Sequence, residues 1–148
     1  MNTNPPISDQ IVILDVIDPD AYTAGTVTSP WLDMSNFEVV MATVMAGSLG
    51  TNATLDAKLE QATDGAGTGA KDVTGKAITQ LTQAGADDSD KQAIIELRSE
   101  EMDVNGGFTH VRLSVTVGTA TSDAGAIVHG IGPRYQQPND ATVAEQVL

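Results

Sequence analysis

Two segments of the chain alternate apolar and polar residues with the period of a β-strand. They are residues 54–60 and 109–117, and their apolar faces consist of Leu55, Ala57 and Leu59 in the first and of Val111, Leu113, Val115 and Val117 in the second. Successive side chains of a strand point to opposite faces of a sheet, so each segment predicts a strand with one face buried. Such a face needs a second layer to cover it, and this restricts the chain to folds built from packed sheets.

Six further segments have the length of a strand and are separated by Gly, Asp and Pro turns. They are residues 11–17, 22–28, 37–46, 73–83, 92–98 and 123–131. Residues 73–83 also fit a short helix, and we favour a strand. Asp18, Pro19 and Asp20 form a turn signal that we expect to end the first of the six segments. No long amphipathic helix interrupts the series. About eight strands at a spacing of roughly ten residues predict an all-β fold, a single-domain antiparallel β-sandwich of jelly-roll type.

The segment 37–46 differs from the two alternating strands because it is apolar on both faces. Phe37 and Val39 fall on one face, and Val40 and Ala42 fall on the other. A central strand that is covered on both sides has this pattern. In a two-layer sandwich, one of the two covers is expected to be a neighbouring subunit.

The ends of the chain differ in composition from its middle. Pro5 and Pro6 favour an extended, unpaired conformation, so residues 1–9 are expected to form an extended N-terminal arm. Residues 10–132 form the predicted sandwich, and residues 133–148 form a polar tail rich in Gln, Asn and Pro. No apolar segment approaches the length of a membrane span, so we expect no membrane partner.

The charge and the cysteine content of the chain exclude several functions. Seven Lys and Arg residues against twenty Asp and Glu residues give a formal net charge of −13. A field of this sign repels phosphate, so we expect no nucleic acid partner. The chain has no cysteine, which excludes a disulfide framework, a thiol nucleophile and a thiolate metal site.

No motif of the sequence predicts catalysis. Residues 65–71 resemble a phosphate-binding loop only in their glycine content, because the residues on both sides of the lysine do not fit the motif. His110 is expected on the polar face of its strand and His129 in a hydrogen-bonded position near the core, and neither has a second ligand at helical spacing. Glu100 and Glu101 are adjacent, so their side chains diverge and cannot share a scissile bond. We therefore expect no enzyme, no catalytic residue, no cofactor and no metal site.

Several segments carry a resemblance to a known family. They are residues 22–28, Trp31-Leu32-Asp33-Met34, and residues 50–62, 71–78 and 108–119. Together they extend over most of the chain, from Tyr22 to Tyr135. The chain resembles a family of small proteins from the structural-gene blocks of tailed phages and prophages.

The resemblance implies a bacteriophage virion structural protein that resembles capsid decoration, or cement, proteins. Decoration proteins of this kind sit as trimers at the quasi-threefold points of the shell or as pentamers on its vertices, where they clamp adjacent capsomers together. The expected location is the capsid surface of the virion, after synthesis in the host cytoplasm. The expected partners are the major capsid protein and further copies of the chain, as a homotrimer, and the binding is non-covalent.

The residues that we expect at interfaces are Pro5, Pro6, Trp31, Met34, Phe37 and Tyr135. The two prolines belong to the arm that is expected to contact the capsid. Trp31, Met34 and the segment 37–46 belong to the expected oligomer or core surface.

Two other functions stay open at this point. One is a tail, neck or vertex component of the same virion, which is expected to form a ring of higher symmetry. The other is a carbohydrate-binding β-sandwich, with Trp31 and Tyr135 as stacking platforms and the acidic loop of residues 87–90 holding calcium.

Overall fold

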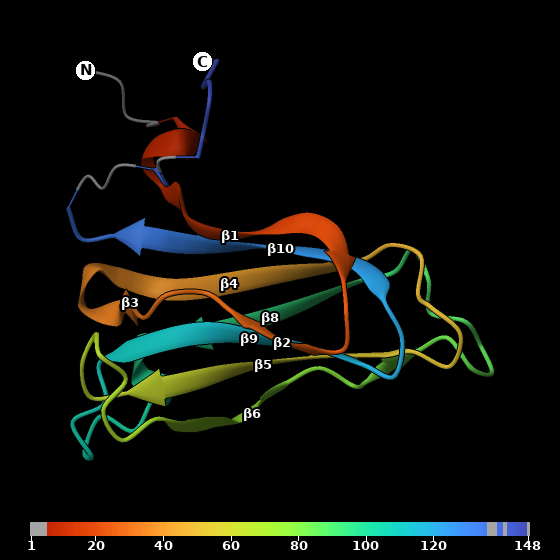
Figure 1. The fold of residues 1–148 in the computed structure, drawn as a ribbon. Helices are drawn as coiled ribbons and strands as arrows, with labels where there is room; N and C mark the ends of the chain where they lie inside the picture. The colour runs from red at the N-terminus through yellow and green to blue at the C-terminus, as the bar shows by residue number, and fades with distance from the viewer. Residues whose placement is uncertain (1–5, 136–138, 141, 148) are drawn as a thin grey trace.

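Two antiparallel sheets packed face to face form the body of the protein (Figure 1). This computed structural model describes residues 6–135, 139–140 and 142–147. The first sheet holds, in order, β1 (Ile11–Tyr22), β10 (Ser122–Pro133), β4 (Phe37–Ala46) and β8 (Gln92–Arg98). The second sheet holds β2 (Gly25–Thr28), β9 (His110–Gly118), β5 (Thr54–Ala62) and β6 (Lys71–Ala77), with β3 (Leu32–Asp33) beside β9 and β7 (Leu81–Thr82) beside β5.

The order of the strands defines a jelly roll. Hydrogen bonds pair β1 with β10, β2 with β9, β4 with β8 and β5 with β6. The chain therefore pairs like one long hairpin that turns between β5 and β6. Wrapping of this hairpin places successive pairs alternately in the two sheets, which is the arrangement of a jelly roll. The prediction of an all-β antiparallel sandwich of jelly-roll type is confirmed.

The core lies between the two sheets and is filled by the residues that alternate in the sequence. Leu55 and Leu59 of β5 and Leu113 of β9 are at most 1% exposed. Val40 and Val44 of β4 cover them from the other sheet and are fully buried. Burial of each such side chain contributes about 2 kcal/mol to folding. The opposite registers of these strands would turn the same residues towards water, so the alternation sets which face points inward.

The first strand is longer than the sequence predicts. The turn signal around Pro19 does not end it, because β1 continues to Tyr22 with an irregular register between Ile17 and Asp20. β1 is an edge strand, where proline removes no hydrogen bond that the sheet requires. The extra residues form a bulge, which bends the strand while the pairing with β10 resumes at Asp20.

Two other predicted strands are each divided. The segment 22–28 contributes its first residue to β1 and only Gly25–Thr28 to β2, so the chain changes sheets at residues 23–24. The segment 73–83 forms β6 and the two-residue β7 rather than one strand. The register of β5 against β6 shifts between Lys58, which pairs with Ala77, and Glu60, which pairs with Asp72, so the irregularity lies at residues 73–76 in the middle of β6.

Helical structure in the described residues is limited to single turns of 3-10 helix. They are η1 (Ile7–Asp9), η2 (Met34–Asn36) and η3 (Ser99–Glu101). No helix of the described part of the chain is long and apolar enough to cross a membrane. Asp33 caps η2 by accepting a hydrogen bond from the Ser35 N–H at 2.9 Å.

Both edge strands of the first sheet, β1 and β8, form hydrogen bonds with residues from other parts of the chain. At β1, Ile13 donates its N–H to Asn139 Oδ1 at 2.9 Å, and its carbonyl accepts the N–H of Asp140 at 2.8 Å. At β8, Lys76 of the opposite sheet donates to the carbonyl of Glu96 at 2.8 Å. An unpaired strand edge can pair with a strand of another chain, and these contacts occupy part of both edges. The outer faces of the two sheets are the larger surfaces that stay open.

Candidate interaction surfaces

The predicted interface residues lie in different environments. Pro6 and Tyr135 are exposed, with Tyr135 74% exposed beyond the end of β10, and Pro5 lies outside the described residues. Met34 and Phe37 are 2% and 4% exposed, so they lie in the core rather than on a surface that a partner can touch. Phe37 occupies space that Gly130 leaves open, because a Cβ on Gly130 would come within 2.6 Å of its ring.

Trp31 is partly buried on the outside of the second sheet. The guanidinium of Arg112 stacks on its ring, 4.5 Å from the ring centroid. Gly67 lies against the ring, and a Cβ on Gly67 would come within 2.5 Å of Trp31 Nε1. The glycine-rich loop and Arg112 therefore occupy much of the surface that a sugar would need for stacking.

The outer face of the second sheet is polar and its charges are paired with one another. Arg112 Nε donates to Glu60 Oε2 at 2.7 Å, and Lys58 Nζ lies 3.3 Å from Glu60 and 2.6 Å from Asp72. The hydrogen bond to Asp72 raises the pKa of Lys58. Further along the same face, the hydroxyls of Thr26 and Thr116 are 2.8 Å apart. These contacts use the charged groups of this face within the protein itself.

The outer face of the first sheet is apolar over β1, β10 and β4. In each pair of an antiparallel ladder the two side chains point to the same side, so the registers define which residues share this face. We call the apolar part of this surface the apolar face, and it consists of Ile11, Ile13, Val16, Val39, Met41, Thr43, Met45, Ile94, Ile127, His129 and Ile131. The same registers place Gln92, Glu96 and Arg98 of β8 on this side of the sheet, so Ile94 is the apolar residue that β8 contributes and the rest of that edge is polar. Met45 is 37% exposed and Ile94 is 64% exposed. The segment 37–46 is therefore apolar on both sides because one side meets the core and the other forms this face.

His129 is a titratable side chain within the apolar face, and Glu96 of β8 lies beyond its neighbour Met41 on the same side of the sheet. The neighbours of His129 across the ladder are Ile13 and Met41. Its Nδ1 is buried and has no hydrogen-bond partner among the described residues, so the expectation of a hydrogen-bonded histidine is wrong for this atom. Burial lowers the pKa of His129. His110 lies on the other sheet, where its Nδ1 is 2.9 Å from Thr109 Oγ1, so the two histidines do not meet.

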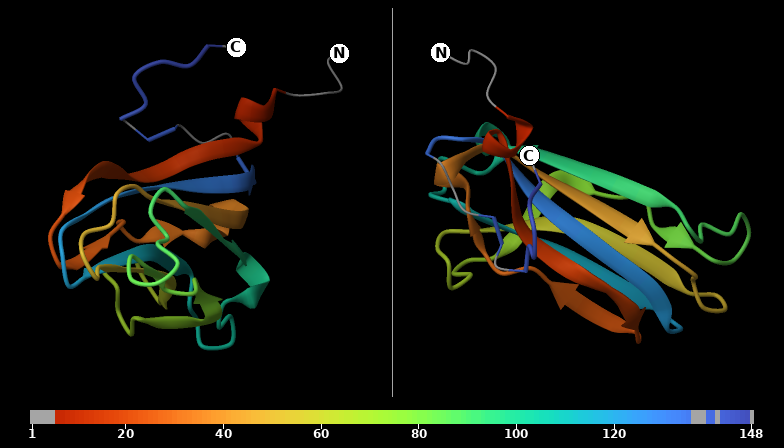
Figure 2. Two further views of the ribbon diagram at one scale, coloured as in Figure 1. Left: turned by 90° about the vertical axis from the view of Figure 1, so that its right-hand side faces the viewer. Right: turned by 90° about the horizontal axis from the view of Figure 1, so that it is seen from above.

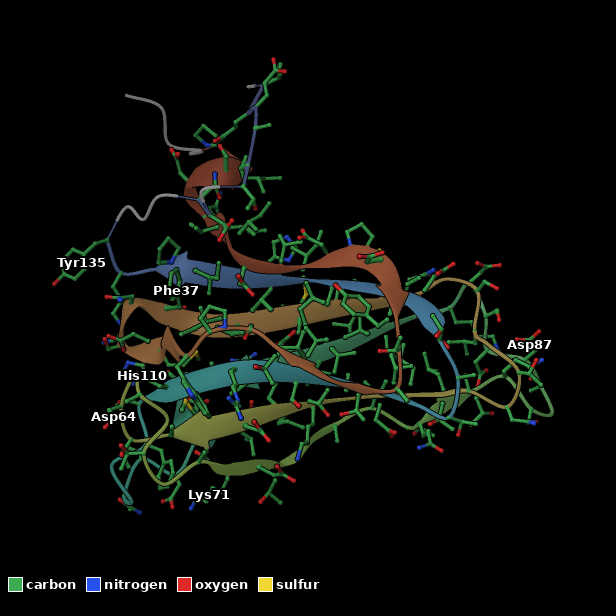
Figure 3. The ribbon with its side chains drawn as sticks, viewed as in Figure 1. Phe37, Asp64, Lys71, Asp87, His110 and Tyr135 are labelled. Carbon is green, nitrogen blue, oxygen red and sulfur yellow. The ribbon has the colours of Figure 1, made fainter. Side chains whose placement is uncertain are left out.

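The acidic loop of residues 87–90 is held by internal contacts. Asp87 accepts hydrogen bonds from Ser89, and Asp88 pairs with Lys91 Nζ at 2.7 Å. These bonds lower the pKa of both carboxyls. Asp87 lies at the opposite end of the sandwich from Tyr135 (Figure 3). No group of three or more His, Cys, Asp or Glu side chains that could hold a metal ion occurs in the described ranges.

η1 and residues 142–147 lie on the same side of the sandwich, next to β1 (Figure 2). η1 precedes β1, and the hydrogen bonds to Ile13 attach residues 139–140 to the outer edge of the same strand. The sequence predicts an arm and a tail but gives no sign that they lie together.

Sequence patterns identified only part of the apolar face. The segment 37–46 was recognised as apolar on both sides, whereas β1 and β10 supply Ile11, Ile13, Ile127 and Ile131 to the same face. The dense apolar run of residues 11–17, interrupted by Asp15, is the signal that points to the β1 contribution, because a strand with one face in water would alternate throughout.

No family model and no curated protein sequence matches the chain. Among solved structures, a chain in the cryo-EM structure of broad bean stain virus is similar over 82% of this chain, with 15% identity and a TM-score of 0.44. A chain in the structure of the Gt strain of infectious bursal disease virus is similar over 86%, with 13% identity and a TM-score of 0.43. This chain spans 66% of the first of these chains and 34% of the second. The class of protein is a jelly-roll β-sandwich by its own strand order, and likenesses at these scores do not define a family.

Proposed function

We propose that the chain is a structural protein of a bacteriophage virion, a decoration protein that binds the outside of the head without covalent chemistry. The observation that carries this proposal is the apolar face on a protein whose formal charge is −13. The jelly roll is an architecture that viral shell proteins and lectins share, which is consistent with the resemblance of the sequence to phage structural proteins.

The size of the apolar face supports a contact with another protein. The three apolar strands lie about 4.8 Å apart, and about seven residues each at about 3.4 Å give a plan area of about 340 Å². An apolar patch of this size on a monomer is often functional, and a standard protein interface buries about 800 Å² per partner. The apolar face has the dimensions of the centre of such an interface, with polar residues around it as a rim.

The ends of the chain add a second means of attachment. Residues 142–147 leave the β1 edge beside η1, so these two segments project from one side of the sandwich (Figure 2). Segments that become ordered on a neighbour cover much surface at an entropic cost. When a protein binds a shell through a rigid face and through its terminal segments at once, it occupies more of the shell's binding sites than it would through either contact alone.

Binding to a phage head tests the proposal directly. Purified heads that lack this protein would be mixed with the wild-type chain and with two variants, and co-sedimentation would be measured. Ile94→Asp places a charge on the apolar face, and Val104→Asp places the same charge at a residue of similar exposure, 62%, outside that face. We expect Ile94→Asp to abolish co-sedimentation and Val104→Asp to retain it. Failure of the wild-type chain to bind heads would refute the proposal.

We also propose that the protein acts as a homotrimer, as the resemblance implies. Light scattering of the purified chain distinguishes a trimer from a monomer and from a larger ring. A ring of about a dozen subunits, together with about a dozen copies per virion, would favour a tail, neck or vertex component in its place. Hundreds of copies per virion would support decoration of the shell.

A further inference from the structure

A groove of about 590 Å³ lies at one end of the apolar face, where Met45 and Gly125 meet Asp90 at the end of the acidic loop of residues 87–90. Its apolar lining consists of Pro19 of the β1 bulge, Ala21, Met45, Ala46, Ala124 and Gly125, and Gln92 of β8 also lines it. Asp20, Asp90 and Asp123 stand around it. We call this feature the acid-rimmed groove.

The backbone is arranged to keep the groove open. A Cβ on Gly125 would come within 3.0 Å of Pro19 Cα, so the bulge can lie this close to β10 only over a glycine. On the other side, a Cβ on Gly47 would come within 2.8 Å of Asp123 Cβ. Both close approaches depend on glycine, and both Pro19 and Asp123 line the same groove.

The carboxylates of the rim are not neutralised by the protein. Within the described residues, the side chains of Asp90 and Asp123 have no ion pair and no hydrogen bond, and Asp20 accepts only the N–H of Ala21, at 2.7 Å. The neighbouring Lys91 is held by Asp88. Unpaired carboxylates around an apolar surface of low polarisability create a field that favours a cation.

The groove continues into the apolar face. Met45 and Gly125 point to the same side as Thr43 and Ile127, which follow two residues away on the same strands. Ile94 of β8 extends this surface beside Thr43. An occupant that covers both the groove and the neighbouring row must be larger than a small ion, and a polypeptide segment has the required length and mixture of side chains.

We propose that the acid-rimmed groove binds a segment of a second protein in which basic side chains alternate with apolar ones. The apolar side chains lie on the apolar lining around Met45 and Gly125, and the basic groups reach the carboxylates of the rim. The inference rests on the proposed function only in taking the partner to be the shell protein of the head. The chemistry of the segment follows from the groove itself.

The probe is an acetylated and amidated hexapeptide of alternating leucine and lysine, added to the full-length ¹⁵N-labelled protein. We expect amide shifts confined to the groove and the row beside it, including Gly47, Gln92 and Gly125. The triple variant Asp20→Asn, Asp90→Asn and Asp123→Asn should weaken binding about tenfold or more at low salt, because it removes three nearby charges. The control Glu38→Gln, Glu100→Gln and Glu145→Gln removes the same number of charges from exposed positions outside the groove and should bind as the wild type does.

Four outcomes would overturn the inference. They are shifts that map to another surface, equal binding by the triple variant, equal binding of a serine–lysine hexapeptide, and full displacement of the peptide by spermidine at equal concentration. The third would show that the apolar lining is not used, and the fourth would show a site for a free cation. The head-binding assay separates this inference from the proposed function. If heads bind the groove variant as well as the wild type, the groove is not the contact while decoration stands.

Discussion

Replacement of Gly67 by alanine tests the link between the glycine-rich loop and Trp31. Gly67 has a φ of +85°, and an added Cβ would come within 2.5 Å of Trp31 Nε1 and 3.0 Å of Cε2. The chain offers a matched control, since Gly75 has a φ of +76° and a Cβ there would meet nothing within 4 Å. Both substitutions impose the same backbone cost, and only the first disturbs the indole ring.

The expected magnitudes follow from these two contributions. A left-handed backbone costs a residue with a Cβ about 1 kcal/mol, which is the full expectation for Gly75→Ala. Crowding of a rigid ring costs a further 1–3 kcal/mol, roughly, so Gly67→Ala should lose about 2–4 kcal/mol. Trp31 cannot move freely, because Arg112 lies against its ring at 4.5 Å from the centroid.

Urea denaturation measures the free energy of unfolding of both variants, and the emission of Trp31 reports on the ring. Trp31 is the only tryptophan, so the signal has one source. We expect a red-shifted emission maximum in Gly67→Ala and an unchanged maximum in Gly75→Ala. Equal stabilities within about 0.5 kcal/mol and equal emission maxima would refute the packing of the loop on Trp31.

Three further predictions concern the core, pH and salt. Leu113→Ala should lower the free energy of unfolding by about 2–5 kcal/mol in urea, because the side chain is fully buried, and a loss below about 1 kcal/mol would contradict its place in the core. Burial lowers the pKa of His129 in the folded protein below its unfolded value of about 6.5. The free energy of unfolding should therefore be highest above about pH 6.5 and fall as the pH drops from there towards the folded pKa. Thermal melts at about pH 7.5 and about pH 5.5 should show this loss in the wild type and a smaller one in His129→Gln. Raising NaCl from about 0.02 M to about 0.3 M should raise Tm, because salt screens the repulsion within a chain of formal charge −13, and a lower Tm would count against that account.

The fold could be predicted from local patterns because strand periodicity and turn residues act over short distances. The alternation in β5 and β9 indicates both the strands and their inward faces. Pro19 shows where this reasoning fails. The same residue that signals a turn in isolation forms a bulge in the protein, because its position on an edge strand leaves no hydrogen bond to lose.

The candidate interface residues could be predicted less well. Large apolar residues such as Met34 and Phe37 suit a core and an interface equally, and only their burial distinguishes the two. Trp31 is a residue type that stacks on sugars. Arg112 and Gly67 contact its ring but are distant in the sequence, so no local pattern indicates that they lie against it.

The sequence by itself determined a jelly-roll sandwich, an acidic surface and a central strand with two apolar faces, since these depend on composition and on the period of two. The tertiary structure alone decided what lies on the second apolar face of β4. It brings β1 and β10 beside β4 and forms the acid-rimmed groove from Pro19, Met45, Asp90 and Asp123. Residues so distant in the chain meet only through the wrapping of the sheets, and no local pattern records that wrapping.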